Sequence, residues 1–292
     1  MKLSTQENIV HVGMPSKTAL QVAELRAAHQ LLDEPLILND PAALPILGTQ
    51  TETNMRRDPF RFNDFPARSI RAAVVVRSRF AEDGLKQFVQ SGGKQYVVLG
   101  AGLDTFALRN IHINEGLHVF EVDHPSTQNW KRTLLEEASI KIPDSMTFVG
   151  VDFERSTLVE GLQRAGFRVD EPAYFSWLGV TIYLSWSVIV VTLNFVASLP
   201  KGSGVVFDYG VPSSLLNPIE SALVDYLGGL IKELGEPWKT SLEPVAIQRE
   251  LQNMGFHSIE DFGPLELNAR YLARRKDGLQ TGGIFRLVSA KT

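Results

Sequence analysis

The sequence predicts an α/β protein with an open, doubly wound, mostly parallel sheet of seven strands. Two observations predict this fold: short apolar runs alternate with stretches of helical periodicity between residues 91 and 288, and one apolar run leads directly into a Gly-Ala-Gly turn at residues 100–102. The chain has 292 residues, 44% of them hydrophobic and 21% charged, which is typical of a globular protein. Because no linker divides it, we expect a single domain over residues 1–292.

The first part of the chain, residues 1–90, is expected to be helical and to contribute to a lid. Apolar residues recur at helical spacing over residues 17–32 and 67–89, and the runs Asp33-Glu34-Pro35 and Ser91-Gly92-Gly93 end these helices. The stretch between the two helices, residues 36–66, holds four prolines and little periodicity. It is interpreted as a segment that follows the surface or forms a lid.

The central part, residues 91–210, is expected to be the ligand-binding core. Strands are predicted at residues 95–99, 117–122, 147–151, 173–178 and 204–209. Helices are predicted at residues 125–138 and 157–165, and from Ser185 or Ser187 to Leu199, with a short helix starting within residues 103–109. The helix that ends at Leu199 is apolar but too short to span a bilayer, so it is interpreted as a buried helix.

The last part, residues 211–292, is expected to add a helical insertion and the closing strands. The insertion covers residues 214–234, a further helix covers residues 244–254, and strands at residues 257–262 and 284–288 complete the sheet. We expect the insertion and the N-terminal helices to form a lid together.

Composition excludes several classes of function. A formal net charge of −4 gives no general attraction to nucleic acid or to an anionic membrane, and we expect neither as a partner. The absence of cysteine excludes disulfides, thiolate zinc sites and a cysteine nucleophile, and the six histidines lack metal-ligand spacing, so no metal site is expected. Residues 1–15 do not resemble a secretory signal, and a cytoplasmic location is the expectation.

The glycine turn at Gly100 and Gly102 is the first candidate binding feature. It follows a buried strand, and ligands of such sheets bind at the carboxyl ends of the strands. Alone, a G-x-G sequence indicates a tight turn as readily as a binding loop. Glu121 and Asp123 end the next strand about 20 residues downstream, where a carboxylate can bind the diol of a ribose. The alternative is a solvated strand end, with Asp123 capping the following helix.

Two absences narrow the cofactor class. Thr105 stands where a dinucleotide-binding loop has its third glycine, and no G-K-[ST] sequence follows the turn to hold a nucleotide triphosphate. Both absences favour a nucleoside cofactor without a pyrophosphate.

Two segments together resemble a known family. The sequence Q-Y-V-V-L-G-A-G-L-D-T at residues 95–105, and F-E-V-D-H-P at residues 120–125 with Lys131 a turn and a half later, resemble the leucine carboxyl methyltransferase-like class of S-adenosylmethionine-dependent methyltransferases. The similarity covers about residues 18–209 and is greatest to the bacterial O-methyltransferase branch. The resemblance implies a class I, Rossmann-like methyltransferase fold and S-adenosyl-L-methionine as cofactor.

The resemblance also implies roles for individual residues at the cofactor. Asp123 would bind the ribose hydroxyls, with Glu121 beside it, and Arg77 would hold the cofactor carboxylate, with Arg26 as a second contributor. The loop under the methionine part of the cofactor would consist of Gly100, Ala101, Gly102 and Asp104, and the adenine would lie against Asp152 and Phe153.

The acceptor side departs from the family pattern. Leu178 stands where many relatives carry a glutamate. Tyr183 and Tyr209 are candidates for lining the acceptor pocket, although either could be a core tyrosine. Arg68 is a candidate contact for an acceptor carboxylate or phosphate. It belongs to seven arginines between residues 56 and 79, whose alternative interpretation is a solvated helix face with paired charges.

These observations predict an S-adenosylmethionine-dependent O-methyltransferase acting on a carboxylate or hydroxyl of a small metabolite. An ionised carboxylate acceptor needs no general base, and no catalytic base is assigned. Two alternatives stay open. One is an NAD(P)-dependent oxidoreductase on a similar sheet. The other is a non-catalytic module that binds S-adenosylmethionine, and Leu178, in place of the family's acidic residue, is compatible with it. The sequence selects neither a small molecule over a protein carboxyl terminus nor an oligomeric state.

Overall fold

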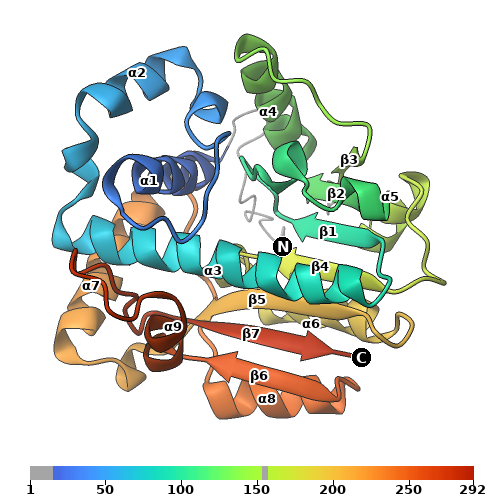
Figure 1. The fold of residues 1–292 in the computed structure, drawn as a ribbon. Helices are drawn as coiled ribbons and strands as arrows, with labels where there is room; N and C mark the ends of the chain where they lie inside the picture. The colour runs from blue at the N-terminus through green and yellow to red at the C-terminus, as the bar shows by residue number, and fades with distance from the viewer. Residues whose placement is uncertain (1–15, 153–156) are drawn as a thin grey trace, which may run out of the picture.

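The computed structural model describes residues 16–152 and 157–292. Within these residues, seven strands form one sheet in the order β3-β2-β1-β4-β5-β7-β6 (Figure 1). The strands are β1 (Gln95–Leu99), β2 (His118–Asp123), β3 (Met146–Gly150), β4 (Ala173–Trp177), β5 (Gly204–Gly210), β6 (Ser258–Phe262) and β7 (Phe285–Lys291). The strands β1 to β5 pair in parallel, and β7 is antiparallel to both of its neighbours. The predicted doubly wound, mostly parallel, seven-stranded sheet is confirmed.

The order of the strands reverses beside β1. The chain passes from β1 outward to β2 and β3, and then returns to place β4 on the other side of β1. Every residue of β1, β4 and β5 is buried, because helices cover both faces of these strands; this explains why they read as continuous apolar runs. A reversal of this kind leaves a crevice at the carboxyl ends of the two strands that flank it.

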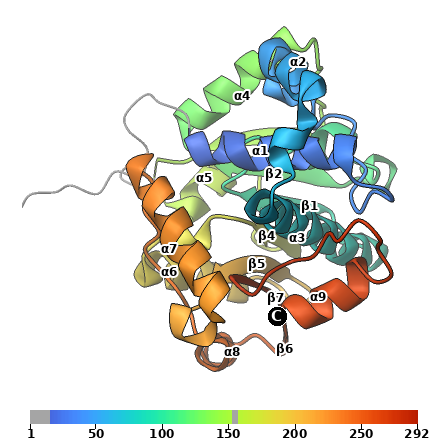
Figure 2. The ribbon, with the colours of Figure 1, turned by 90° about the vertical axis from the view of Figure 1, so that its left-hand side faces the viewer.

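Two apolar clusters attach helices to the two faces of the sheet. One cluster packs α5 (Leu158–Arg164), α6 (Trp186–Ala197) and α8 (Pro244–Asn253) on one face. The other packs α3 (Phe65–Gln90) and α9 (Pro264–Tyr271) on the opposite face, and the view in Figure 2 separates these two layers. The sheet is therefore the central layer, and these helices leave its edges and the ends of its strands uncovered.

A third cluster builds the wall beyond the strand ends. It joins α1 (Lys17–Leu32) and α2 (Thr49–Arg57) to α4 (Pro125–Glu137). In Figure 1, α1, α2 and α7 (Pro218–Glu233) lie on the side to which β1 points. No residue of α7 is buried, which suits a helix laid over the surface rather than built into the core.

A buried ionic cluster fixes α1 to α3. Arg71, only 1% exposed, donates to both carboxylate oxygens of Asp33 at 2.8 and 2.9 Å, and the imidazole of His29 lies 2.7 Å from the same carboxylate. Burial alone would raise the pKa of Asp33, but hydrogen bonds from His29 and Arg71 lower it below its ordinary value. The ionised carboxylate at the end of α1 thus holds this helix against the core.

The structure corrects four details of the sequence prediction. Residues 36–66 are more helical than expected, because two short 3₁₀ turns (Pro45–Leu47 and Pro59–Phe62) flank α2. Residues 103–109 form only a 3₁₀ turn (Phe106–Arg109). The helix α6 is buried on one face only, with Val191 71% exposed, because α6 forms the outer layer of the sandwich. The short helix α9 was not predicted.

The described residues also bear on membrane insertion. Over this part of the chain, no helix combines the length and the apolar composition that crossing a membrane requires.

Candidate functional site

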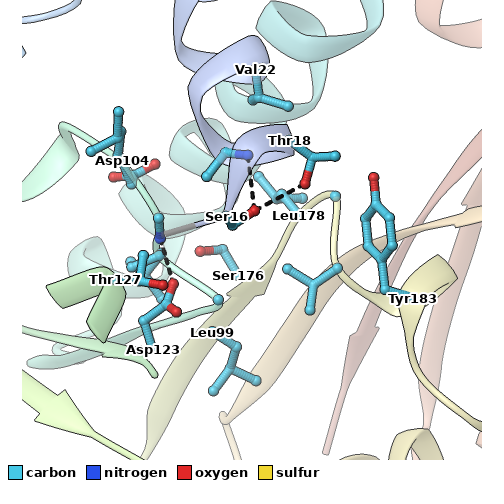
Figure 3. Close-up of a pocket in the computed structure, with 18 of the residues that line it drawn as sticks. Ser16, Thr18, Val22, Leu99, Asp104, Asp123, Thr127, Ser176, Leu178 and Tyr183 are labelled. Carbon is cyan, nitrogen blue, oxygen red and sulfur yellow. Dashed lines mark hydrogen bonds between the residues drawn. The ribbon is translucent and has the colours of Figure 1, made fainter. Parts of the chain in front are cut away.

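A cavity lies at the carboxyl ends of β1 and β4, where the strand order reverses (Figure 3). The loop after β1, residues 100–104, forms its floor, together with the loop after β4, residues 178–180. The N-terminal half of α1 and Glu236, from the loop after α7, complete the wall. This is the position at which open α/β sheets bind their ligands.

The glycine loop after β1 approaches the loop after β4 closely. Gly100 and Gly102 both have positive φ, +64° and +49°, and a Cβ on Gly100 would lie 2.4 Å from Cγ2 of Val180. The backbone N–H of Ala101 donates to the carbonyl of Val122 at 3.1 Å, and that of Asp104 to the carbonyl of Ala101 at 2.7 Å. The loop is therefore a fixed cradle in which the two glycines permit a conformation and a contact closed to other residues.

Asp123 projects into the cavity from the end of β2 (Figure 3). Its carboxylate accepts hydrogen bonds from the backbone N–H of Gly102 at 2.6 Å and of His124 at 2.7 Å. Burial raises the pKa of Asp123, and these two N–H donors counteract the rise. The carboxylate thus links the second strand to the glycine loop, and it keeps lone pairs for a ligand because each oxygen can accept more than one hydrogen bond.

The alternative in which Asp123 caps the following helix is wrong. His124 is the N-cap of α4, and its Nδ1 accepts from the backbone N–H of Ser126 at 3.2 Å. The proline at position 125 occupies the first turn of α4 as predicted.

Glu121 does not reach the cavity, contrary to the expectation that it accompanies Asp123 there. It is 1% exposed and lies 2.5 Å from Nζ of Lys131, which also donates to the carbonyl of Asp104 at 2.5 Å. Burial raises the pKa of Glu121 to about 7, against the lowering effect of Lys131. Because Glu121 lies two residues before the end of β2, α4 covers it, and its carboxylate supports the glycine loop through Lys131.

Two arginines line the cavity, and both are paired with buried carboxylates. Nη1 of Arg77 lies 2.7 Å from Oδ2 of Asp208 on β5. Nε of Arg26 lies 3.1 Å from Oδ2 of Asp40, and its Nη2 donates to the carbonyl of Leu103 at 2.5 Å. The two arginines predicted from the resemblance are thus both brought to the cavity.

The residues predicted at the adenine are placed less directly. Asp152 follows the end of β3 by two residues, at the same edge of the sheet as Asp123, and it is not among the residues that line the cavity. Phe153 lies outside the described residues. The roles of both stay predictions.

Of the three acceptor-side candidates, only Tyr183 lines the cavity, beside Leu178 (Figure 3). Burial raises the pKa of the Tyr183 phenol. Tyr209 is a core residue of β5 whose hydroxyl donates to Asp261 at 2.7 Å, and Arg68 donates to the carbonyl of Asn63. Neither reaches the cavity, and we withdraw both as acceptor-pocket residues.

Charge pairing, as the alternative interpretation has it, holds for four of the other arginines between residues 56 and 79, although Arg71 is buried and lies on no solvated face. These four form ion pairs with carboxylates: Arg56 with Glu52, Arg61 with Glu24, Arg71 with Asp33, and Arg79 with Asp83. These pairs account for most of the positive charge without a ligand.

Several cavity residues were missed by the sequence analysis. The carboxylate of Glu236 accepts from the backbone N–H of Lys17 at 3.1 Å and from the hydroxyls of Ser16, at 3.2 Å, and Thr18. No local motif signals a contact between residues more than 200 positions apart. Asp208, which lies behind the cavity and pairs with Arg77, did carry a signal, because it is a single carboxylate within the apolar run of β5.

Comparison with known proteins places this chain in a family. Residues 19–197 match the family model described as leucine carboxyl methyltransferase. A Bacillus subtilis protein named "putative S-adenosyl-L-methionine-dependent methyltransferase YktD" is 30% identical over 285 residues, which cover 90% of this chain and 93% of that protein. A Mycobacterium marinum protein with the same description, without an individual name, is 31% identical over 173 residues, which cover 57% of this chain and 56% of that protein.

Solved structures agree on the fold. The crystal structure described as a "putative methyltransferase" from Thermobifida fusca superimposes with a TM-score of 0.56 at 17% identity, covering 92% of this chain and 94% of that one. The residues matched by the family model include the strands that carry the glycine loop and Asp123. The chain belongs to the leucine carboxyl methyltransferase family.

Proposed function

We propose that this protein is an S-adenosyl-L-methionine-dependent methyltransferase that methylates a carboxylate or hydroxyl oxygen of a small metabolite. The observation that carries the proposal is the carboxylate of Asp123, which the N–H of Gly102 holds where the strand order reverses. Beside it lies the glycine loop, in which a Cβ on Gly100 would clash with Val180. Family membership supports the methyltransferase activity, and the names of the relatives support the cofactor. The oxygen acceptor is the finer part of the proposal.

The residues around the cavity fit the ribose and the methionine part of the cofactor. Asp123 would accept hydrogen bonds from the ribose diol, and Gly100 and Gly102 would let the backbone approach the methionine part. In the same cavity, Arg77 would bind the carboxylate of the methionine part, because a guanidinium matches a carboxylate with parallel N–H donors. Arg26 supports the floor by its bond to the carbonyl of Leu103.

S-adenosylmethionine supplies a methyl group that its sulfonium charge already activates. The chain's own contribution is then to align an acceptor oxygen with that methyl group and to exclude water. Leu178, Val180 and Leu184 give the cavity an apolar wall for this purpose, and Tyr183 offers the one phenol among the described lining residues. An ionised carboxylate acceptor would need no base; a hydroxyl acceptor would need a proton acceptor, and Glu236 is a carboxylate that also lines the cavity.

Calorimetric titration with S-adenosylmethionine and S-adenosylhomocysteine tests the proposal, with NAD as the control ligand. Saturable binding of the two sulfur ligands and none of NAD is the expected result. Turnover is then followed as release of S-adenosylhomocysteine with panels of carboxylic acids, phenols and amines. Binding of NAD instead would contradict the cofactor assignment, and methylation of nitrogen with no methylation of oxygen would contradict the acceptor assignment.

A further inference from the structure

A buried carboxylate holds Arg77 from behind the cavity. Asp208 on β5 is 4% exposed and does not itself line the cavity. Its Oδ2 lies 2.7 Å from Nη1 of Arg77, and its Oδ1 accepts from the backbone N–H of Gly179 at 2.6 Å. One carboxylate therefore ties the arginine to the loop after β4.

The loop after β4 also limits where the guanidinium can lie. Gly179 has a φ of +73°, and a Cβ at this position would lie 2.5 Å from Nη2 and 2.9 Å from Nη1 of Arg77. The guanidinium is thus packed against bare backbone on one side and bonded to Asp208 on another. A long, flexible side chain is reduced to one orientation before any ligand arrives, which lowers the entropic cost of binding.

The carboxylate of Asp208 lies on the strand beside a departure from the family pattern. Leu178, which lines the cavity, stands where the family resemblance implies an acidic residue after β4. Asp208 supplies a carboxylate from the neighbouring strand, β5, which pairs with β4 in parallel. The carboxylate of Asp208 reaches Arg77 without lining the cavity, so its charge acts on the arginine and not directly on a ligand.

We propose that Asp208 is a positioning residue that orients Arg77 toward the carboxylate of the cofactor's methionine part. The inference rests on the proposed function through the role of Arg77. A pure charge argument gives the opposite expectation: if Asp208 only neutralised Arg77, its removal would strengthen binding of a ligand carboxylate. The sign of the effect therefore separates positioning from competition.

The test compares two ligands in Asp208→Asn. S-adenosylhomocysteine carries the amino-acid carboxylate, and 5′-methylthioadenosine shares its nucleoside and sulfur but lacks the amino-acid part. We expect the variant to bind S-adenosylhomocysteine about tenfold more weakly, as for loss of one charge-assisted hydrogen bond, and 5′-methylthioadenosine within about twofold of the unaltered chain. A merely structural role would weaken both ligands together.

Asp261→Asn is the matched control. Asp261 is also a strand carboxylate with a fully buried side chain and an arginine partner, Arg286 at 2.9 Å, and it lies outside the cavity. It should cost stability in the same way and leave the ratio of the two affinities unchanged. If Asp208→Asn does not fold, Asp208→Glu replaces it: this variant keeps the charge but displaces it by one methylene, and it should also weaken S-adenosylhomocysteine selectively.

Arg77→Lys separates the two levels of the argument. Selective loss of S-adenosylhomocysteine binding in Arg77→Lys, with no loss or a gain in Asp208→Asn, would overturn the positioning role and leave the proposed function intact. Equal binding of both ligands by Arg77→Lys and the unaltered chain would overturn the role of Arg77 and, with it, the role of Asp208.

Discussion

Replacing Asp123 with alanine removes hydrogen bonds on two sides of one carboxylate. On the protein side, it deletes the acceptor of the N–H groups of Gly102 and His124, at 2.6 and 2.7 Å. Two hydrogen bonds to a charged group contribute about 3–6 kcal/mol to stability. Since burial already disfavours the ionised carboxylate, which is why its pKa is raised, we expect a net loss of stability of about 2 kcal/mol.

On the ligand side, the same variant loses the bonds to the ribose diol. Loss of one or two charge-assisted hydrogen bonds costs about 2–4 kcal/mol, which corresponds to affinity lower by about 30- to 1,000-fold. Asp123→Asn keeps the volume and one acceptor oxygen and should show a smaller loss.

Calorimetry with S-adenosylhomocysteine and 5′-methylthioadenosine measures this prediction. Both ligands contain the ribose, so both should weaken by the same factor, unlike the selective effect expected at Arg77. Asp144→Ala, which removes an exposed carboxylate before β3, is the control and should bind both ligands normally. Affinities within about threefold of the unaltered chain in a folded Asp123→Ala variant would refute the ribose assignment.

Three further predictions concern Gly100 in the loop after β1, the buried pair of Glu121 and Lys131, and the contact, called here the clasp, between Glu236 and the start of α1. Gly100→Ala should lower affinity for S-adenosylhomocysteine at least about tenfold in titrations, because its Cβ would lie 2.4 Å from Val180; Gly92→Ala, with φ +91° and no atom within 4 Å, carries the strain alone and should bind normally. Glu121 has a pKa of about 7 when folded and an ordinary value of 4.5, so the folded chain holds an extra proton between these values and loses up to about 3 kcal/mol of stability as pH rises through them. Urea midpoints from pH 4 to 8 should fall for the unaltered chain and stay flatter for Glu121→Gln; parallel profiles would contradict this. Glu236→Gln weakens the acceptor at the start of α1 and should speed hydrogen exchange there, whereas unchanged exchange would show that the clasp adds no stability.

The strands could be predicted from the sequence because their signal is local. Each central strand is buried on both faces, so it must be a short apolar run, and turn residues bound it. The helix α9 escaped prediction because its eight residues, Pro264–Tyr271, bury only Leu267 and so show little periodicity. The helix α2 escaped for the same reason, since it buries only Met55.

The same distinction between local and distant contacts explains which residues of the site could be predicted from the sequence. Gly100 and Asp123 lie in short motifs whose spacing along the chain reports their chemistry, and the structure brings both to the cavity. The contact of Glu236 with Thr18 spans 218 positions and depends on how the loop after α7 lies over α1. Glu121 was misplaced because a spacing rule marks the end of a strand without saying which of two carboxylates α4 covers.

Among the described lining residues, the carboxylates outnumber the arginines: Asp104, Asp123 and Glu236 compare with Arg26 and Arg77. Each described lining arginine has a buried carboxylate partner, Asp208 for Arg77 and Asp40 for Arg26, and Asp123 is held by backbone N–H groups. Such a site keeps a negative net charge, and it also selects a ligand through the directions of its donors and acceptors, because little reorganisation is left to occur on binding. Selectivity for S-adenosylmethionine would then come from two fixed groups of one cavity, Asp123 and Arg77, and the apolar lining at Leu178 would be free to vary with the acceptor.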